Sequence, residues 1–105
     1  MKAILGVIAL AAVCAVTAPA VMASEKLAAA GGCNKCHAMS KKVMGPSYKE
    51  IAAKYKGDAK APALLAEHVR KGSKGVWGKL AMPPTPANKF NDADLNATIA
   101  WILKS

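Results

Sequence analysis

The residues best suited to chemistry are two cysteines followed directly by a histidine, in the stretch Cys33-Asn34-Lys35-Cys36-His37. Two thiols on one turn of chain can add across the two vinyl groups of a single porphyrin, and this C-x-x-C-H spacing is typical of a covalently attached c-type haem. The histidine follows at once, so its imidazole can bind the iron from the proximal side of the ring. The motif therefore predicts one covalent haem c.

The same pair of cysteines has two other possible uses, a zinc site and a thiol–disulfide redox centre. Structural zinc normally has four protein ligands, and the sequence has no second Cys/His pair to complete the set. A thioredoxin-like redox pair would lie beside a βαβ pattern, which this sequence does not contain. The spacing therefore favours haem over both alternatives.

A haem iron held by one histidine needs a second axial ligand to exchange electrons reversibly, and a methionine thioether raises its reduction potential. Met82 lies in a glycine- and proline-containing stretch between residues 72 and 89, far enough from His37 for the chain to pass around the ring. Loops this long without regular structure are often functional. We predict Met82 as the second ligand. The alternatives are Met44, His68, or a Met82 that only fills a gap in the core.

Residues 1–23 have the pattern of a secretory signal peptide, with a basic Lys2, a following apolar run and an A-x-A-like cleavage site at 21–23. An uncleaved membrane anchor is the alternative, but a membrane span needs about 20 apolar residues. Thr17 and Pro19 interrupt the run before that length is reached. We therefore expect export to the periplasm and removal of this segment.

The predicted mature chain, residues 24–105, forms one small domain. The third cysteine, Cys14, would be removed with the signal peptide, so Cys33 and Cys36 would be the only thiols left. A protein core alone is marginal for a domain of this size. A covalently held haem would solve this problem, because the large apolar ring becomes the centre of the core.

The mature domain is predicted to be all-α, because helix signals recur along it and no segment alternates like a strand for long. Ser47 and Glu50 form a capping-box pattern, and Asn91 precedes acidic residues that suit the first turn of a helix. About four helices are expected. The first two are residues 25–31 and residues 48–55. The third has Pro62 in its first turn and ends at Gly72, and the last begins after Asn91.

Several motifs together resemble the class I cytochromes c, and most closely the short bacterial subgroup of soluble periplasmic electron carriers. The matching stretches are residues 33–37, 43–48, 72–78, 82–84 and 100–103. The resemblance implies an all-helical fold wrapped around one covalent haem, in which the N- and C-terminal helices cross. It also implies a one-electron carrier without substrate turnover of its own, and hence no enzyme.

The resemblance also assigns roles to residues around the haem. The Pro46 carbonyl would accept a hydrogen bond from Nδ1–H of His37 and so orient this ligand. Trp77 would donate to a haem propionate, and His68 stands where the family has Arg or His beside the same group. One departure is Ala28, which stands about where the family often has an aromatic residue that packs on the last helix.

The charge of the chain indicates the class of partner. It has 15 Lys and Arg residues against 6 Asp and Glu residues, a formal net charge of +9, which loss of Lys2 lowers by one. A basic domain can bind nucleic acid, but export argues against such a partner, and a merely solubilising surface is the other alternative. We expect lysines around the haem edge, Lys35 first among them, to steer docking to acidic patches on redox proteins.

Candidate partners are an oxidase, a nitrite reductase, a peroxidase or a photosynthetic reaction centre, and the sequence does not choose among them. We expect a monomer without stable membrane insertion. The competing function is a ligand-binding haem sensor or a haem enzyme. Either would need an open sixth position at the iron, which Met82 would close.

Overall fold

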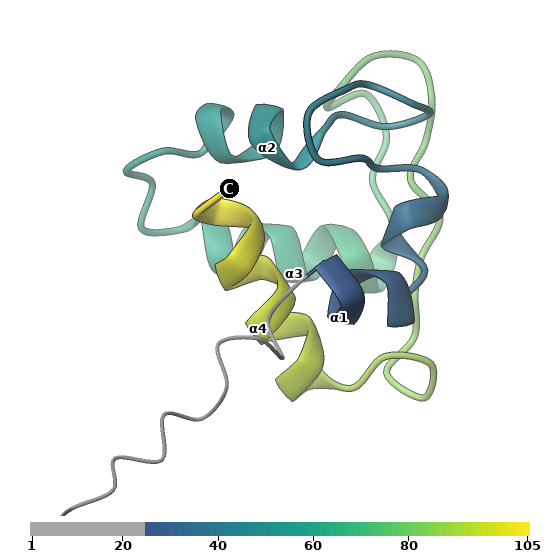
Figure 1. The fold of residues 1–105 in the computed structure, drawn as a ribbon. Coiled ribbons are helices and arrows are strands. Elements are labelled where there is room, and N and C mark those ends of the chain that lie inside the picture. The colour runs from purple at the N-terminus through teal and green to yellow at the C-terminus, as the bar shows by residue number, and fades with distance from the viewer. Residues whose placement is uncertain (1–24) are drawn as a thin grey trace, which may run out of the picture.

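The computed structural model describes residues 25–105, so the predicted signal peptide lies outside the described residues. The elements in chain order are α1 (Glu25–Ala30), the short 3₁₀ helix η2 (Cys33–Lys35), α2 (Tyr48–Lys54), α3 (Ala61–Lys71) and α4 (Asp92–Leu103) (Figure 1). Over residues 25–105 there are two isolated β-bridges and no strand. The all-α prediction is therefore confirmed. No helix in this range is long and apolar enough to cross a lipid bilayer.

Local capping residues set the starts of α2 and α4, as the sequence predicted. Ser47 Oγ accepts from the Glu50 amide at 3.1 Å, and Glu50 Oε2 accepts from the Ser47 amide at 3.1 Å, which completes a capping box. At α4, Asn91 Oδ1 accepts from the Asp94 amide at 2.8 Å. The α2 helix ends at Lys54, one residue before the predicted end, because Tyr55 already has the cap conformation.

The α3 helix has a proline at its start and a glycine at its end, again as predicted. Gly72 adopts φ +79°, a conformation that favours glycine. A Cβ at this position would also lie 2.6 Å from the Met82 carbonyl oxygen. The end of α3 therefore lies directly against the segment that contains Met82, and no larger residue fits between them.

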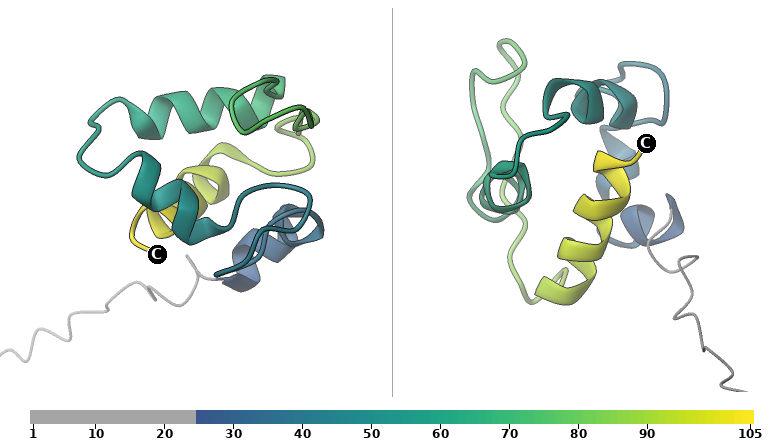
Figure 2. Two further views of the ribbon diagram at one scale, coloured as in Figure 1. Left: turned by 90° about the horizontal axis from the view of Figure 1, so that it is seen from above. Right: turned by 90° about the vertical axis from the view of Figure 1, so that its left-hand side faces the viewer.

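The α4 helix is the central packing element, because α1, α2 and α3 all contact it. Figure 2 shows α3 and α1 on opposite sides of the molecule with α4 between them. The contact between α1 and α4 agrees with the terminal helix pairing that the resemblance implied. Ala28 of α1 is fully buried, so a small side chain occupies the place where the family often has an aromatic ring.

Phe90, just before α4, supplies an aromatic ring close to α1 instead. It is buried with Leu95 and Ile99, and Leu27 of α1 packs against this cluster. A Cβ at Gly31 would lie 2.9 Å from two Phe90 ring atoms. Because Gly31 has no side chain, the Phe90 ring can lie directly against the end of α1.

Candidate haem site

A cavity of about 410 Å³ lies at the centre of the fold. Its lining comes from the segment after α1, from α2, α3 and α4, and from the long segment between α3 and α4. In the right-hand view of Figure 2, this long segment and the region of η2 lie on opposite sides of the molecule. The lining includes every residue that the sequence predicted for the site, namely Cys33, Cys36, His37, Pro46, His68, Trp77 and Met82.

The walls of the cavity suit a flat apolar ring. Three helices supply aliphatic side chains to the lining: Ile51 from α2, Leu65 and Val69 from α3, and Ile99 and Ile102 from α4. The remaining lining combines a pair of thiols, an imidazole and a thioether. Apolar walls with this set of donors fit a covalently attached haem.

The two cysteines are brought to one wall by a tight turn. Gly32 adopts φ +79° and begins η2, and the amides of Cys36 and His37 both donate to the Cys33 carbonyl, at 3.2 and 2.9 Å. Both thiols are free and partly buried. Burial raises the pKa of the Cys33 thiol. The turn thus presents two unbonded sulfurs from a single loop of chain.

His37 is held firmly by its neighbours. Its Nδ1 lies 2.6 Å from the Pro46 carbonyl oxygen. A carbonyl oxygen can only accept, so the proton is on Nδ1 and the lone pair on Nε2 is free for a metal. This is the hydrogen bond that the resemblance implied. On the other flank, a Cβ at Gly45 would lie 2.7 Å from His37 Cε1, so only glycine lets the chain pass this close to the ring.

Tyr48 packs beside His37 and closes the cavity next to α4. The two ring centroids are 5.8 Å apart, and the ring of Trp101 meets that of Tyr48 edge-on at 5.1 Å. Tyr48 is 1% exposed, and its hydroxyl has no hydrogen-bond partner among the described residues. Burial, with smaller contributions from Cys33 and Glu25, raises its pKa to about 12. Trp101 itself is half-buried.

Met82 reaches the cavity from a segment that is fixed to α3. Ser73 and Met82 exchange two backbone hydrogen bonds, of 3.1 and 2.8 Å. Three residues later, the Thr85 amide donates to the Val69 carbonyl at 2.7 Å. Met82 is therefore positioned by backbone contacts on both sides of it. Met44, the alternative methionine, also lines the cavity, but it precedes Gly45 and so lies on the His37 side.

Trp77 and His68 lie on the cavity wall, and the propionate contacts expected of them remain predictions. Trp77 is half-buried and packs against the cluster formed by Ile51, Tyr55 and Ala61. Lys54, which the sequence analysis did not single out, places its Nζ 5.1 Å from the centre of the Trp77 ring. No sequence signal links a lysine in α2 to a tryptophan in a later loop, because this contact depends on the tertiary fold.

Within residues 25–105 there is no group of three or more His, Cys, Asp or Glu side chains that could hold a metal ion. The described residues therefore do not supply the further ligands that a zinc site at Cys33 and Cys36 would need.

Comparison with known proteins gives a consistent result. Residues 19–102 match the family model described as "Cytochrome C oxidase, cbb3-type, subunit III". Cytochrome c2 of Rubrivivax gelatinosus is 59% identical over 80 residues, covering 76% of this chain and 94% of that protein. Cytochrome c-551 of Allochromatium vinosum is 43% identical over 89 residues, covering 82% and 89%.

A solved structure is also similar. The crystal structure of wild-type Nitrosomonas europaea cytochrome c552 matches with a TM-score of 0.68 and 42% sequence identity, over 77% of this chain and 98% of that one. Relatives and structure agree with the helical fold and with a cavity whose lining fits a haem. The chain belongs to the small class I cytochromes c, a family of electron carriers that are not enzymes and that bind one covalently attached haem c.

Proposed function

We propose that this chain is a soluble periplasmic mono-haem carrier whose iron is bound axially by His37 and Met82. The observation that supports this most is that both residues line one cavity, His37 with its Nδ1 already engaged and Met82 on a separate, anchored segment. When bound, the haem supplies one-electron exchange between ferric and ferrous iron. His37 would bind the iron through Nε2, Cys33 and Cys36 would form the thioethers, and Met82 would supply the second iron ligand.

The protein's own contribution would be to keep the surroundings of the haem the same in the ferric and the ferrous state. The Pro46 carbonyl orients His37, and the aliphatic walls exclude water. Trp77 and His68, which both line the cavity, would contact the propionates at the edge of the ring. Because the Met82 segment is anchored at residues 73 and 85, the axial thioether would move little on electron transfer. A closed sixth position distinguishes this proposal from a haem sensor or a haem enzyme.

The optical spectrum of the purified protein tests the proposal. We expect a low-spin haem in both oxidation states, a sulfur-to-iron charge-transfer band in the oxidised form, and a reduced spectrum that carbon monoxide leaves unchanged. The haem should also remain with the polypeptide after extraction with acidified organic solvent. A spectrum that shifts at once with carbon monoxide would indicate an open site and favour the sensor or enzyme.

The periplasmic location depends on residues 1–23, which we propose to be a cleaved signal peptide. We expect the haem-bearing protein to begin at Ser24 or within a residue or two of it. The intact mass should therefore equal residues 24–105 plus one haem. Haem-bearing protein that still contains Met1 would contradict the proposal of a free periplasmic protein.

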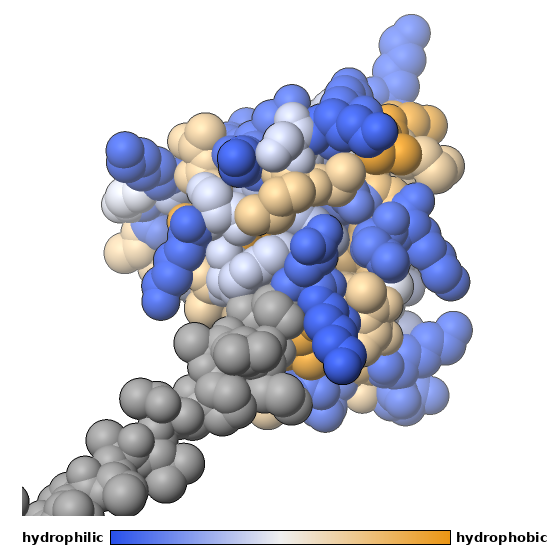
Figure 3. Space-filling view, viewed as in Figure 1, coloured by the Kyte–Doolittle hydropathy of each residue, from blue (hydrophilic) through white to orange (hydrophobic). Residues whose placement is uncertain are grey.

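For partners, we propose redox proteins with acidic docking patches, such as an oxidase, a nitrite reductase, a peroxidase or a reaction centre. Lys42 and Lys79 line the cavity and are exposed, and Lys35 of η2 is exposed as well. Figure 3 shows polar side chains over most of the described surface on the face that it displays. Exposed Met44 and Leu80 stand next to these lysines in the cavity lining. This mixed surface suits brief, charge-steered encounters.

Electron transfer to an acidic partner should therefore slow as salt is added. Exposed charges are screened over about 8–10 Å near physiological ionic strength, so the second-order rate constant should fall at least several-fold between low and physiological salt. Stopped-flow measurements over a series of ionic strengths check this. Lys35→Gln should weaken the salt dependence, whereas a rate constant that does not change with salt would reject steering.

A further inference from the structure

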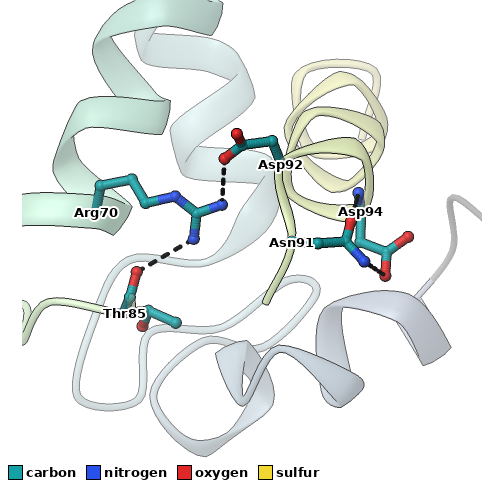
Figure 4. Close-up of polar contacts among 5 residues, drawn as sticks. All are labelled: Arg70, Thr85, Asn91, Asp92 and Asp94. Atoms are coloured by element: carbon teal, nitrogen blue, oxygen red, sulfur yellow. Dashed lines mark hydrogen bonds and ion pairs between the residues drawn. The ribbon is translucent and has the colours of Figure 1, made fainter. Parts of the chain in front are cut away.

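Arg70, in the last turn of α3, connects three parts of the fold (Figure 4). Its Nη1 donates to the Thr85 carbonyl oxygen at 3.2 Å, and its Nη2 donates to Asp92 Oδ1 at 2.7 Å. Thr85 belongs to the long segment between α3 and α4, and Asp92 is the first residue of α4. One side chain therefore ties the Met82 segment to two helices.

Both backbone polar groups of Thr85 are bound by α3. Its amide donates to the Val69 carbonyl at 2.7 Å, and its carbonyl accepts from Arg70. The Ser73–Met82 pair fixes the same segment at Met82 itself. The segment from 82 to 85 thus has backbone hydrogen bonds at Met82 and at the Thr85 amide, and one contact that depends on a side chain, from Arg70 to the Thr85 carbonyl.

We propose that Arg70 is a positioning residue that holds the segment 82–85 against α3 and so keeps the Met82 sulfur at the iron. This inference rests on the proposed axial role of Met82. Arg70 would not touch the haem or the iron. It would act through Thr85, by keeping the segment closed.

The chemistry of the contact suits this role better than that of an ordinary surface ion pair. The guanidinium is planar and presents several donors in a rigid fork, so it can bind two acceptors at once. The Arg70 side chain is only 20% exposed, whereas its partner Asp92 is 81% exposed. The contact to the Thr85 carbonyl is therefore largely shielded from water, and loss of Arg70 would leave this carbonyl without its charged donor.

Arg70→Gln tests the proposal, and Lys71→Gln is its matched control. Lys71 is the next residue in α3 and has the same charge, but its Nζ pairs at 3.6 Å with Glu67 in the same helix. Cyanide can bind the ferric iron only when Met82 has moved away. Its apparent affinity and its binding rate therefore report the fraction of molecules in which Met82 is not bound to the iron. We expect cyanide to bind about tenfold faster in Arg70→Gln, the effect of one lost charge-assisted hydrogen bond. Lys71→Gln should stay within about twofold of wild type.

Amide hydrogen exchange supplies a second readout that does not use the iron. The Thr85 amide should exchange faster in Arg70→Gln, while amides within α2 keep their wild-type rates. Arg70→Lys should restore part of the protection, because one ammonium can replace one of the two contacts. If Arg70→Gln unfolds, Asp92→Asn gives a milder test, since it weakens the second anchor of the guanidinium but keeps an acceptor.

The outcomes are distinct. Equal cyanide rates and equal Thr85 exchange in the Arg70 and Lys71 variants would overturn the positioning role. Faster exchange at every amide would show a general loss of stability and would also overturn it. If wild type lacks the sulfur-to-iron band, the proposed ligation by Met82 is wrong and this inference falls with it, which separates that failure from a failure of Arg70 alone.

Discussion

Without its covalent haem, the chain is expected to lose its native fold. Ile51, Leu65, Val69, Ile99 and Ile102 line the cavity, and without the ring each would lose part of the roughly 1.5–3 kcal/mol that burying such a side chain contributes. The whole free energy of unfolding of a small domain is about 5–15 kcal/mol. The predicted mature domain is too small to absorb such a loss, so we expect the haem-free chain to be unfolded or collapsed without fixed packing.

The double variant Cys33→Ser/Cys36→Ser, prepared without haem, provides this test. Near-ultraviolet circular dichroism should show no fixed environment for Trp77 and Trp101, and any remaining helix should melt without a cooperative transition. Cys14→Ser is the matched control, because the predicted signal peptide containing it would be removed. Native-like aromatic dichroism in the haem-free double variant would show that the protein core alone suffices.

Met82→Ala is expected to have the second largest effect. The variant should lose the sulfur-to-iron charge-transfer band, and its reduction potential should fall because a thioether favours ferrous iron. If binding of the Met82 thioether stabilises the closed site by about 3 kcal/mol, removal of the thioether should raise the affinity of the iron for cyanide about 100-fold. Redox titration and cyanide titration measure the two quantities.

Met44→Ala is the matched control for this experiment, since Met44 also lines the cavity and is 59% exposed. It should keep the charge-transfer band and the potential of the wild type. If the band instead disappears in Met44→Ala and survives in Met82→Ala, the other methionine is the ligand. Absence of the band already in the wild type would favour the bis-histidine alternative through His68.

The features that the sequence predicted well are those that depend on neighbouring residues. The capping box at Ser47 and Glu50 and the cap at Asn91 are complete within four residues, so their patterns can be interpreted without the fold. Which side chains would come together could also be predicted, because C-x-x-C-H has few chemical uses and the resemblance extends along the predicted mature domain; their roles at a haem stay predictions. All seven of these side chains line the same cavity.

The features that could not be predicted depend on contacts between distant residues. Arg70 contacts Thr85 and Asp92, 15 and 22 positions further along, and among the many basic residues of this chain nothing marks it out. The placement of Lys54 over Trp77 and of Phe90 against Gly31 likewise follows from how helices pack. Such pairs have no local pattern, so only the three-dimensional structure identifies them.

The packing of α1 against α4 has a consequence for the order in which the molecule is assembled. Helix α1 has only six residues, far fewer than the roughly 12–15 that an isolated helix needs to be even marginally stable in water. Its packing partner, α4, comes after all the other described helices in chain order. The segment with Cys33, Cys36 and His37 therefore emerges long before its neighbouring helix can form. Haem attachment to Cys33 and Cys36 would therefore be easiest before α4 packs, and the packing of α4 would then close the fold around the ring.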